Sequence, residues 1–175
     1  MLSPQIWPTN PVLRRPSDPV RDFWPYLYDI FENLREVMYA NKGVGISAPQ
    51  IGINKQILIA TNWDEKSKKN KPGKNGKVGK KNKDICLGDF VVMNPEIITC
   101  DTTICTSDEW CVSLPGIFGK VPRYKSITIR YMDERWESHT KEFSWFTGYI
   151  IQHEIDHLNG ILFVDKMTEE IKKKK

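Results

Sequence analysis

The sequence predicts a single domain, residues 1–175, that combines helices with β-strands. A length of 175 residues is enough to enclose one hydrophobic core. Several short apolar runs end at turn-forming residues, which is typical of strands. Two longer stretches repeat apolar residues every three or four positions, as helices with one buried face do. We therefore expect helices at about 24–40 and 150–160, with strands between them.

The first helix follows a segment, residues 6–20, that is rich in Pro and Asn and is predicted to be irregular. Pro25 suits the first turn of a helix, where no backbone N–H is needed. The helix should bury one stripe of apolar side chains, formed by Leu27, Ile30, Phe31, Leu34, Val37 and Met38. This stripe predicts core packing and carries no chemistry.

The strands are predicted from short apolar or alternating runs. The runs are residues 56–60, 90–95, 96–100 and 126–132. Asn94 and Pro95 are expected to end the second run, because proline cannot donate a ladder hydrogen bond. Residues 133–137 are predicted to form a turn, and 141–143 to lead into the last helix.

The positive charge of the chain is concentrated in two segments. The formal net charge is +4, but residues 66–83 contain nine lysines and residues 172–175 four more, so the remainder carries −9. Residues from about 64 to 85 are therefore expected to be a disordered or mobile insert between two strands. Residues 166–175 are expected to be a short basic tail. We expect no specific nucleic-acid binding by the fold, because a basic groove is not implied.

The cysteines and the N-terminus indicate a reducing compartment. The four cysteines, Cys86, Cys100, Cys105 and Cys111, form no CxxC pair. No signal peptide is visible at the start of the sequence, and no apolar stretch is long enough to span a membrane. We expect a cytoplasmic protein with free thiols and no membrane association.

Residues 150–160 carry the most informative motif. His153 and His157 are four positions apart, which on a helix places both rings on one face within reach of one metal ion. Glu154 stands where a carboxylate can take a proton from a water molecule at that ion. Two histidines on an amphipathic helix can also be structural, but the chain has only three histidines in all. Asn159-Gly160 is a plausible helix end.

A third ligand must come from elsewhere, because a catalytic site of this kind takes three protein ligands and leaves room for water. Cys111 is the candidate, although a single cysteine is more often a small buried apolar residue.

Residues 43–50 (GVGISAPQ) are a weak match to a phosphate loop because the third glycine is missing. Gln50 is either a hydrogen-bond donor at the edge of a site or an ordinary loop residue.

Three stretches together resemble peptide deformylase. They are residues 43–50 (GVGISAPQ), 109–113 (EWCVS) and 152–157 (QHEIDH), and they occur in the order and spacing of that family. The resemblance extends over nearly the whole chain, from about Asn10 to Asp165. It implies an α+β fold in which antiparallel strands wrap around a central metal-binding helix. It also implies removal of the formyl group from the N-terminal formylmethionine of nascent polypeptides.

The resemblance further implies a metal centre. Its ligands would be Cys111, His153 and His157, and the divalent ion would be Fe²⁺, with Zn²⁺ or Ni²⁺ able to substitute. Glu154 would take a proton from the attacking water and deliver it to the leaving amine. The substrates would be N-formylmethionyl peptides, which places the protein close to the ribosome, and we expect a monomer.

The implied substrate contacts come from three parts of the chain. The Gln50 side chain and the backbone N–H of Val112 would hold the oxyanion. Gly45 and Ile46 would pair with the substrate peptide through their backbone. The candidates for the pocket that takes the methionine side chain are Val44, Phe146, Tyr149 and Ile150.

The chain departs from the family pattern at three tryptophans. Trp110, Trp136 and Trp145 stand where the family usually carries glycine, which can take backbone angles that tryptophan cannot. One hypothesis is that UGA codons, read as glycine in the source, have been translated as tryptophan. A natural variant that uses Trp110 in its pocket, and a catalytically impaired metal-binding relative, are the alternatives.

Two other functions share parts of the pattern. A zincin-like metalloprotease also uses HExxH, but it takes a third His or Glu downstream, where only Asp165, Glu169 and Glu170 are available. A structural metal site in a binding protein takes four protein ligands, and no fourth is visible.

Overall fold

The computed structural model describes residues 10–22, 25–63 and 86–171. The predicted insert at 64–85 and the tail residues 172–175 lie outside the described residues, as does Trp24. The helices are α1 (Leu27–Ala40), α2 (Trp145–Leu158) and the short α3 (Phe163–Lys166), with 3₁₀ turns η1 (Pro11–Arg14) and η2 (Ala48–Ile51).

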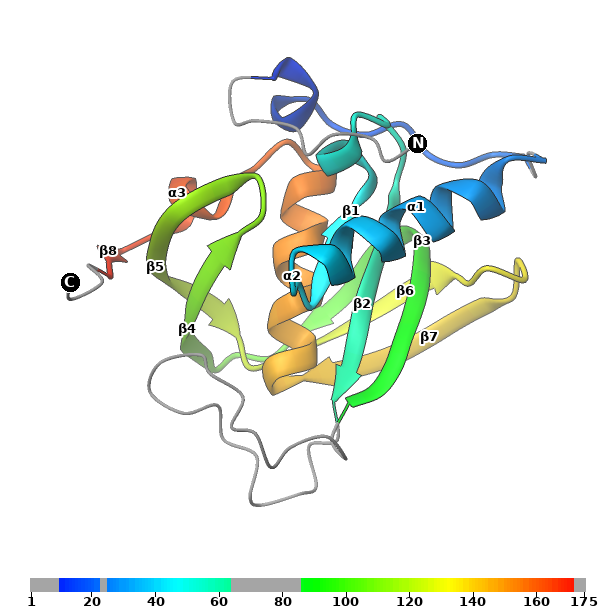
Figure 1. Ribbon diagram of the computed structural model, residues 1–175. Coiled ribbons are helices and arrows are strands. Elements are labelled where there is room, and N and C mark those ends of the chain that lie inside the picture. Colours follow the sequence, from blue (N-terminus) through cyan, green and yellow to red (C-terminus); the bar gives the residue numbers. More distant parts are fainter. Residues whose placement is uncertain (1–9, 23–24, 64–85, 172–175) are drawn as a thin grey trace.

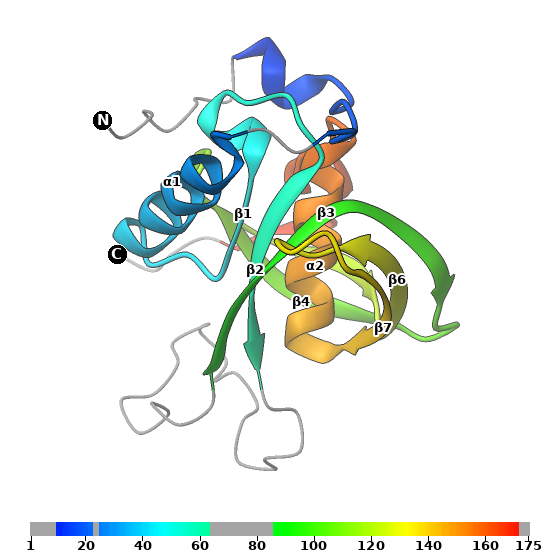
Figure 2. The ribbon, with the colours of Figure 1, turned by 90° about the vertical axis from the view of Figure 1, so that its right-hand side faces the viewer.

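The strands form two antiparallel sheets. The larger sheet has the order β1-β2-β3-β6-β7, and its strands are β1 (Gly45–Ser47), β2 (Ile57–Trp63), β3 (Cys86–Cys100), β6 (Ser126–Met132) and β7 (Ser138–Ser144). The smaller sheet has the order β4-β5-β8, and its strands are β4 (Ile104–Cys111), β5 (Leu114–Tyr124) and β8 (Glu169–Glu170). Figures 1 and 2 show α2 between the two sheets, with strands around it. The predicted α+β fold with a central helix is confirmed.

Alternate residues of β2 point to opposite faces of the larger sheet, and one helix packs against each face. Ile57 and Ile59 belong to a buried cluster with the apolar stripe of α1. Leu58 and Ala60 belong to a second cluster, which contains the apolar residues of α2. Successive strand residues point to opposite faces, so an uninterrupted apolar run serves two cores. The larger sheet therefore packs against α1 on one face and against α2 on the other.

Several elements agree with their sequence predictions. The apolar stripe of α1 is buried as expected, and β6 covers the predicted residues 126–132. The predicted strand at 56–60 is found as β2, which extends further to Trp63. Helix α2 ends before Asn159 and Gly160, and Gly160 has φ +73°, the left-handed conformation that suits a helix end.

The predicted end of a strand at Asn94-Pro95 is wrong. Strand β3 continues through both residues, with a register shift against β6 between Met93 and Glu96. Asn94 takes a left-handed conformation at φ +49°, and its side-chain amide bonds both the N–H and the C=O of Val20. The irregularity is therefore absorbed as a bulge, which is where a strand tolerates proline.

Other strands were not predicted because their sequences are polar or punctuated. Strand β7 has only one buried residue, Phe143, so it resembles a loop leading into the helix. Strand β1 is three residues long and lies in the glycine-rich stretch. Within the predicted basic tail, β8 pairs with β5 at residues 169–170.

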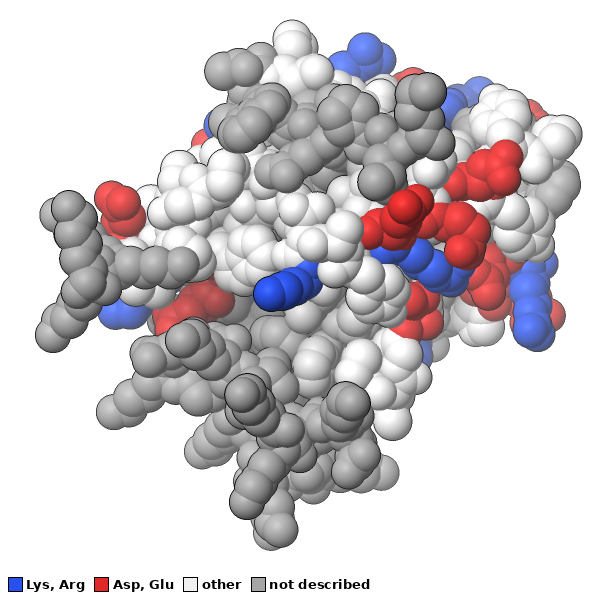
Figure 3. Space-filling model, in the orientation of Figure 1, with Lys and Arg blue, Asp and Glu red and all other residues white. Residues whose placement is uncertain are grey.

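The face drawn in Figure 3 mixes acidic and basic side chains rather than gathering basic ones. Arg35 of α1 forms ion pairs with Glu32, Asp89 and Glu134, which accounts for charges of both signs lying together over this helix. These pairs tie α1 to β3 and to the turn after β6.

Candidate active site

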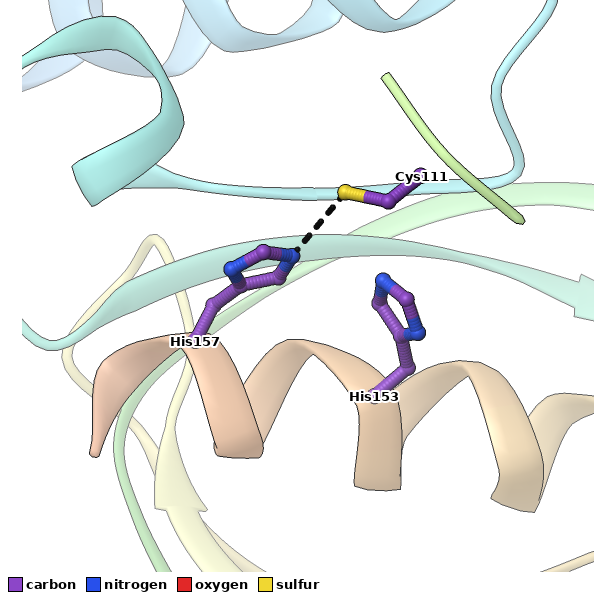
Figure 4. Close-up of side chains that lie close together, drawn as sticks. All are labelled: Cys111, His153 and His157. Carbon is purple, nitrogen blue, oxygen red and sulfur yellow. Dashed lines mark hydrogen bonds between the residues drawn. The ribbon is translucent and has the colours of Figure 1, made fainter. Parts of the chain in front are cut away.

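Cys111, His153 and His157 come together between the small sheet and the central helix. One ligand atom from each lies within 4.8 Å of the others, and all three residues are buried. The Sγ of Cys111 is 3.2 Å from Nε2 of His157, and the ring of His153 faces the same space (Figure 4). A thiolate and two imidazoles around one point form a donor set that suits a transition-metal ion.

The local structure explains this convergence. The two histidines share one face of α2 because they are one helical turn apart. Cys111 is the last residue of β4, and Glu109, two residues before it, is buried on the same face of the strand. Trp110 lies between them and is 43% exposed, so its indole points away from the site.

A buried network of charges holds His153. Its Nδ1 lies 2.8 Å from Oε2 of Glu109, and Arg123 donates to both carboxylate oxygens of Glu109 at 2.7 and 2.8 Å. Arg123 also donates to Asp156, which accepts from Lys166 at 2.6 Å. Two carboxylates and two cations therefore balance one another beneath the site.

The network sets the protonation states. Burial opposes ionisation of Glu109, but its bonds to Arg123 and His153 lower its pKa to about 2. Burial alone would lower the pKa of His153, but bonds to Cys111 and Glu109 raise it well above its ordinary value. The pKa of His157 is held well below its ordinary value by burial and by His153. Glu109 is therefore ionised near neutral pH, and the two rings differ in their affinity for a proton.

These supporting residues were given no role from the sequence. The signal that could have found Glu109 is strand alternation, because a residue two before a ligand on the same strand shares its face. Asp156 is three residues after His153 on the helix, and acidic side chains buried at such positions need cationic partners. Arg123 is distant in sequence and could be matched to them only through the hairpin register.

Glu154 is a buried carboxyl group on α2. It is 4% exposed, and burial raises its pKa to about 7. Its Oε2 has no hydrogen-bond partner among the described residues, nor does the buried Nδ1 of His157. An unpartnered carboxylate oxygen on the residue that follows His153 fits a site that receives a polar ligand or a metal-associated water.

Gln50 reaches the same space from η2. Its Nε2 lies 3.4 Å from both Sγ of Cys111 and Oγ of Ser113, and its Oε1 is turned toward Ser47. The amide therefore presents its donor end to the ligand cluster. Val112 follows Cys111 directly at the turn between β4 and β5, so its backbone borders the site.

The candidate substrate residues are only partly brought together. Gly45 and Ile46 belong to β1, an edge strand of the larger sheet, and a Cβ on Gly45 would lie 2.8 Å from Oε1 of Glu154. Ile150 belongs to the apolar cluster that contains the buried residues of α2, and Val44 and Phe146 pack against that cluster. Tyr149 is not in this cluster and instead bonds Cys105 of β4.

The three unexpected tryptophans fall into two groups. Trp136 and Trp145 have φ of +63° and +48°, the left-handed region that favours glycine. The Nε1 of Trp136 is also buried without a partner among the described residues. Trp110 is not among the described residues with positive φ, and Cys111 beside it keeps its place in the cluster.

The downstream acids needed by a zincin-like protease lie elsewhere. Asp165 pairs with Arg14, and Glu169 pairs with Lys120. Cys111 therefore takes the third position of the cluster. No fourth His, Cys, Asp or Glu joins this cluster within the described ranges, which disfavours a structural metal site.

Comparison with known proteins agrees with this geometry. The polypeptide deformylase family model matches residues 6–173. The chain belongs to the polypeptide deformylase family. The peptide deformylase of Thermus thermophilus is 34% identical over 161 residues, which cover 91% of this chain and 79% of the relative. Two crystal structures of peptide deformylases extend the comparison to the fold.

The enzyme of Thermotoga maritima superposes with a TM-score of 0.79 at 30% identity, covering 96% of this chain and 99% of the other. The Met-Ala-Ser-bound enzyme of Acinetobacter baumannii superposes with a TM-score of 0.80 at 28% identity, covering 95% and 99%. As a deformylase, this protein is a metal-dependent hydrolase that removes the N-terminal formyl group of nascent polypeptides.

Proposed function

We propose that deformylation takes place at the cluster of Cys111, His153 and His157, with Glu154 as the acid–base group. The observation that supports this most directly is the convergence of three buried ligand atoms, two of them on the helix that also carries the buried, unpartnered carboxylate oxygen of Glu154. The ion is proposed to be Fe²⁺, with Zn²⁺ or Ni²⁺ able to substitute, because all three accept thiolate and imidazole ligands. Such an ion acts as a Lewis acid and makes water nucleophilic near neutral pH.

Groups around the cluster are proposed to transfer the proton and to stabilise the negative charge that develops on the formyl oxygen. Glu154 accepts the proton of the attacking water and returns it to the amine that leaves. Its pKa of about 7 suits both steps, because the group can hold or release a proton near neutrality. The Nε2 of Gln50 and the backbone N–H of Val112 donate to the oxygen of the formyl group as it gains negative charge.

The substrate peptide is proposed to run along β1. Strand β1 is an edge strand of its sheet, so Gly45 and Ile46 can pair with an extended peptide through backbone hydrogen bonds. The cluster of Val44, Phe146 and Ile150 supplies apolar surface for the methionine side chain. The Acinetobacter baumannii relative is bound to Met-Ala-Ser, and we propose that this chain acts on formylated peptides of that kind.

Formate release from formyl-Met-Ala-Ser tests the proposal. Protein loaded anaerobically with Fe²⁺ should release formate and leave the peptide bonds intact. Glu154→Ala should bind the ion but lose about 100-fold or more of the rate. Cleavage of internal peptide bonds would instead indicate the protease, and an active Glu154→Ala variant would contradict the assigned role.

The cellular setting is also proposed. Nascent chains are the substrate, so we expect the protein in the cytoplasm near ribosomes. No helix in the described part of the chain is long and apolar enough to cross a membrane. All of the proposed site residues come from one chain, which supports a monomer. Analytical ultracentrifugation of the metal-loaded protein would test this, and a stable dimer would contradict it.

A further inference from the structure

The orientation of the Gln50 amide depends on Ser47. The Oε1 of Gln50 accepts one hydrogen bond from the backbone N–H of Ser47 at 2.8 Å and one from its hydroxyl at 2.9 Å. A carboxamide has its oxygen and its NH₂ group on opposite sides of one carbon. Fixing the oxygen against Ser47 therefore directs the NH₂ group toward Cys111 and Ser113.

The location of Ser47 makes this constraint effective. It is the last residue of β1 and precedes η2, the turn that carries Gln50. Ser47 and Ser113 are completely buried, and Gln50 is 3% exposed, so water has little access to compete for the amide. A rotated amide would place its NH₂ group against the backbone N–H of Ser47, which is a donor, and would lose the bond from that N–H.

We propose that Ser47 is a positioning residue for deformylation: its hydroxyl, together with its N–H, locks the Gln50 amide with the donor end facing the site of oxyanion formation. The inference rests on the proposed role of Gln50. Preorganised donors stabilise developing charge only when they already point at it, so loss of the hydroxyl should lower kcat and leave KM almost unchanged. The hydroxyl also faces Glu154, and the test must separate these two routes.

A double-mutant cycle makes this separation. Ser47→Ala should lower kcat about three- to tenfold with KM within about twofold, because the backbone donor remains. Gln50→Ala should lower kcat roughly 100- to 1,000-fold. In the Gln50→Ala background, adding Ser47→Ala should have no further effect. An equal loss in both backgrounds would show that Ser47 acts through Glu154 or through packing, and would overturn the proposal.

Ser17 provides a matched control. It is also a buried serine, but its Oγ has no hydrogen-bond partner among the described residues. Ser17→Ala should leave kcat and KM unchanged. If Ser47→Ala also leaves kcat within twofold of the wild type, the proposal is wrong. Ser47→Thr keeps the hydroxyl and should therefore retain most of the kcat that Ser47→Ala loses.

A second measurement does not depend on turnover. The side-chain amide protons of Gln50 in the zinc-loaded protein should give a resolved, slowly exchanging NMR pair. Ser47→Ala should broaden this pair or speed its exchange, whereas Ser17→Ala should not. An unchanged pair in Ser47→Ala would overturn the proposal. Absence of formate release by the wild type, with the NMR effect present, would instead count against the proposed function and leave the amide lock standing.

Discussion

The Nδ1 of His153 lies 2.8 Å from a carboxylate oxygen of Glu109. With a pKa of about 2, Glu109 is ionised near neutral pH and can only accept, so Nδ1 must carry the proton. When a metal ion displaces the other ring proton, the one on Nδ1 therefore remains, and Nε2 of His153 is the nitrogen that would ligate. A carboxylate behind a ligating imidazole also increases its basicity. The charge network under α2 is therefore part of the proposed metal centre rather than a separate stabilising feature.

Glu109→Gln should weaken metal binding. An amide can still contact His153, but it carries no charge to support an imidazole ligand, so we expect a roughly 10- to 100-fold lower affinity for Zn²⁺. Competition with a chelator of known affinity measures this. Glu96→Gln is the control, because Glu96 pairs with Arg130 on the surface. Equal affinities for both variants would contradict the proposed role of Glu109.

Arg123→Met should be strongly destabilising. Its side chain is 2% exposed, and removing it leaves Glu109 and Asp156 buried without their shared cation. We expect a loss of about 3–5 kcal/mol in the free energy of unfolding, measured with urea. Arg130→Met removes an exposed ion pair and should cost less than about 1 kcal/mol. A similar small loss for both variants would mean that the buried network contributes little.

Glu154 should make the stability of the chelator-treated protein depend on pH. Its folded-state pKa of about 7 lies above its ordinary value of 4.5, because burial disfavours the charged form. The carboxyl therefore contributes stability that is fully present below pH 4.5 and is lost as the pH rises through 7. Relative to Glu154→Gln, the wild type should lose about 3 kcal/mol across this range. A difference in unfolding free energy between the two proteins that does not change with pH would contradict the raised pKa of Glu154.

Gly45→Ala should impair catalysis more than stability. The added Cβ would lie 2.6 Å from Cγ2 of Ile150 and 2.8 Å from Oε1 of Glu154, so the acid–base group must move. A displacement of this kind can cost about 100-fold in kcat/KM. Gly116→Ala is a contrasting variant, because its Cβ meets nothing within 4 Å but its φ is +85°. It should lower stability by about 1 kcal/mol and leave kcat/KM unchanged.

The sequence predicted the parts of the site that are encoded by short spacings. His153 and His157 on one helix face follow from a separation of four residues, and the apolar alternation of β6 was sufficient for a strand. Local patterns could not pair Arg123 with Glu109, since Arg123 lies opposite Cys105 in the β4–β5 ladder and its contact with Glu109 arises only through side chains in the folded hairpin. They also could not show that β3 passes through Asn94, because Val20, 74 residues away, supplies the compensating hydrogen bonds.

The hypothesis of recoded UGA codons can be decided from the gene. Trp136 and Trp145 occupy left-handed conformations, as expected if these positions evolved with glycine, whereas Trp110 does not share this feature. The hypothesis predicts UGA at all three codons, and glycine at these positions in tryptic peptides of the protein isolated from its source. Three UGG codons would rule it out.

The left-handed backbone at Trp136 and Trp145 also predicts that glycine variants will be more stable than alanine variants at these two positions, which reverses the usual order. Alanine normally stabilises a chain more than glycine does, because glycine gains more freedom on unfolding. At φ of +63° and +48°, however, a Cβ strains the folded state by about 1–2 kcal/mol, which exceeds that entropic difference. Trp136→Gly and Trp145→Gly should therefore each be more stable than the matching alanine variant, by about 0.5–1 kcal/mol in urea unfolding. Comparing Gly with Ala at one site cancels the loss of the indole, including the contact between Trp145 and Lys125. Trp110, in a strand, should show the normal order, and the same order at all three sites would contradict the assigned strain.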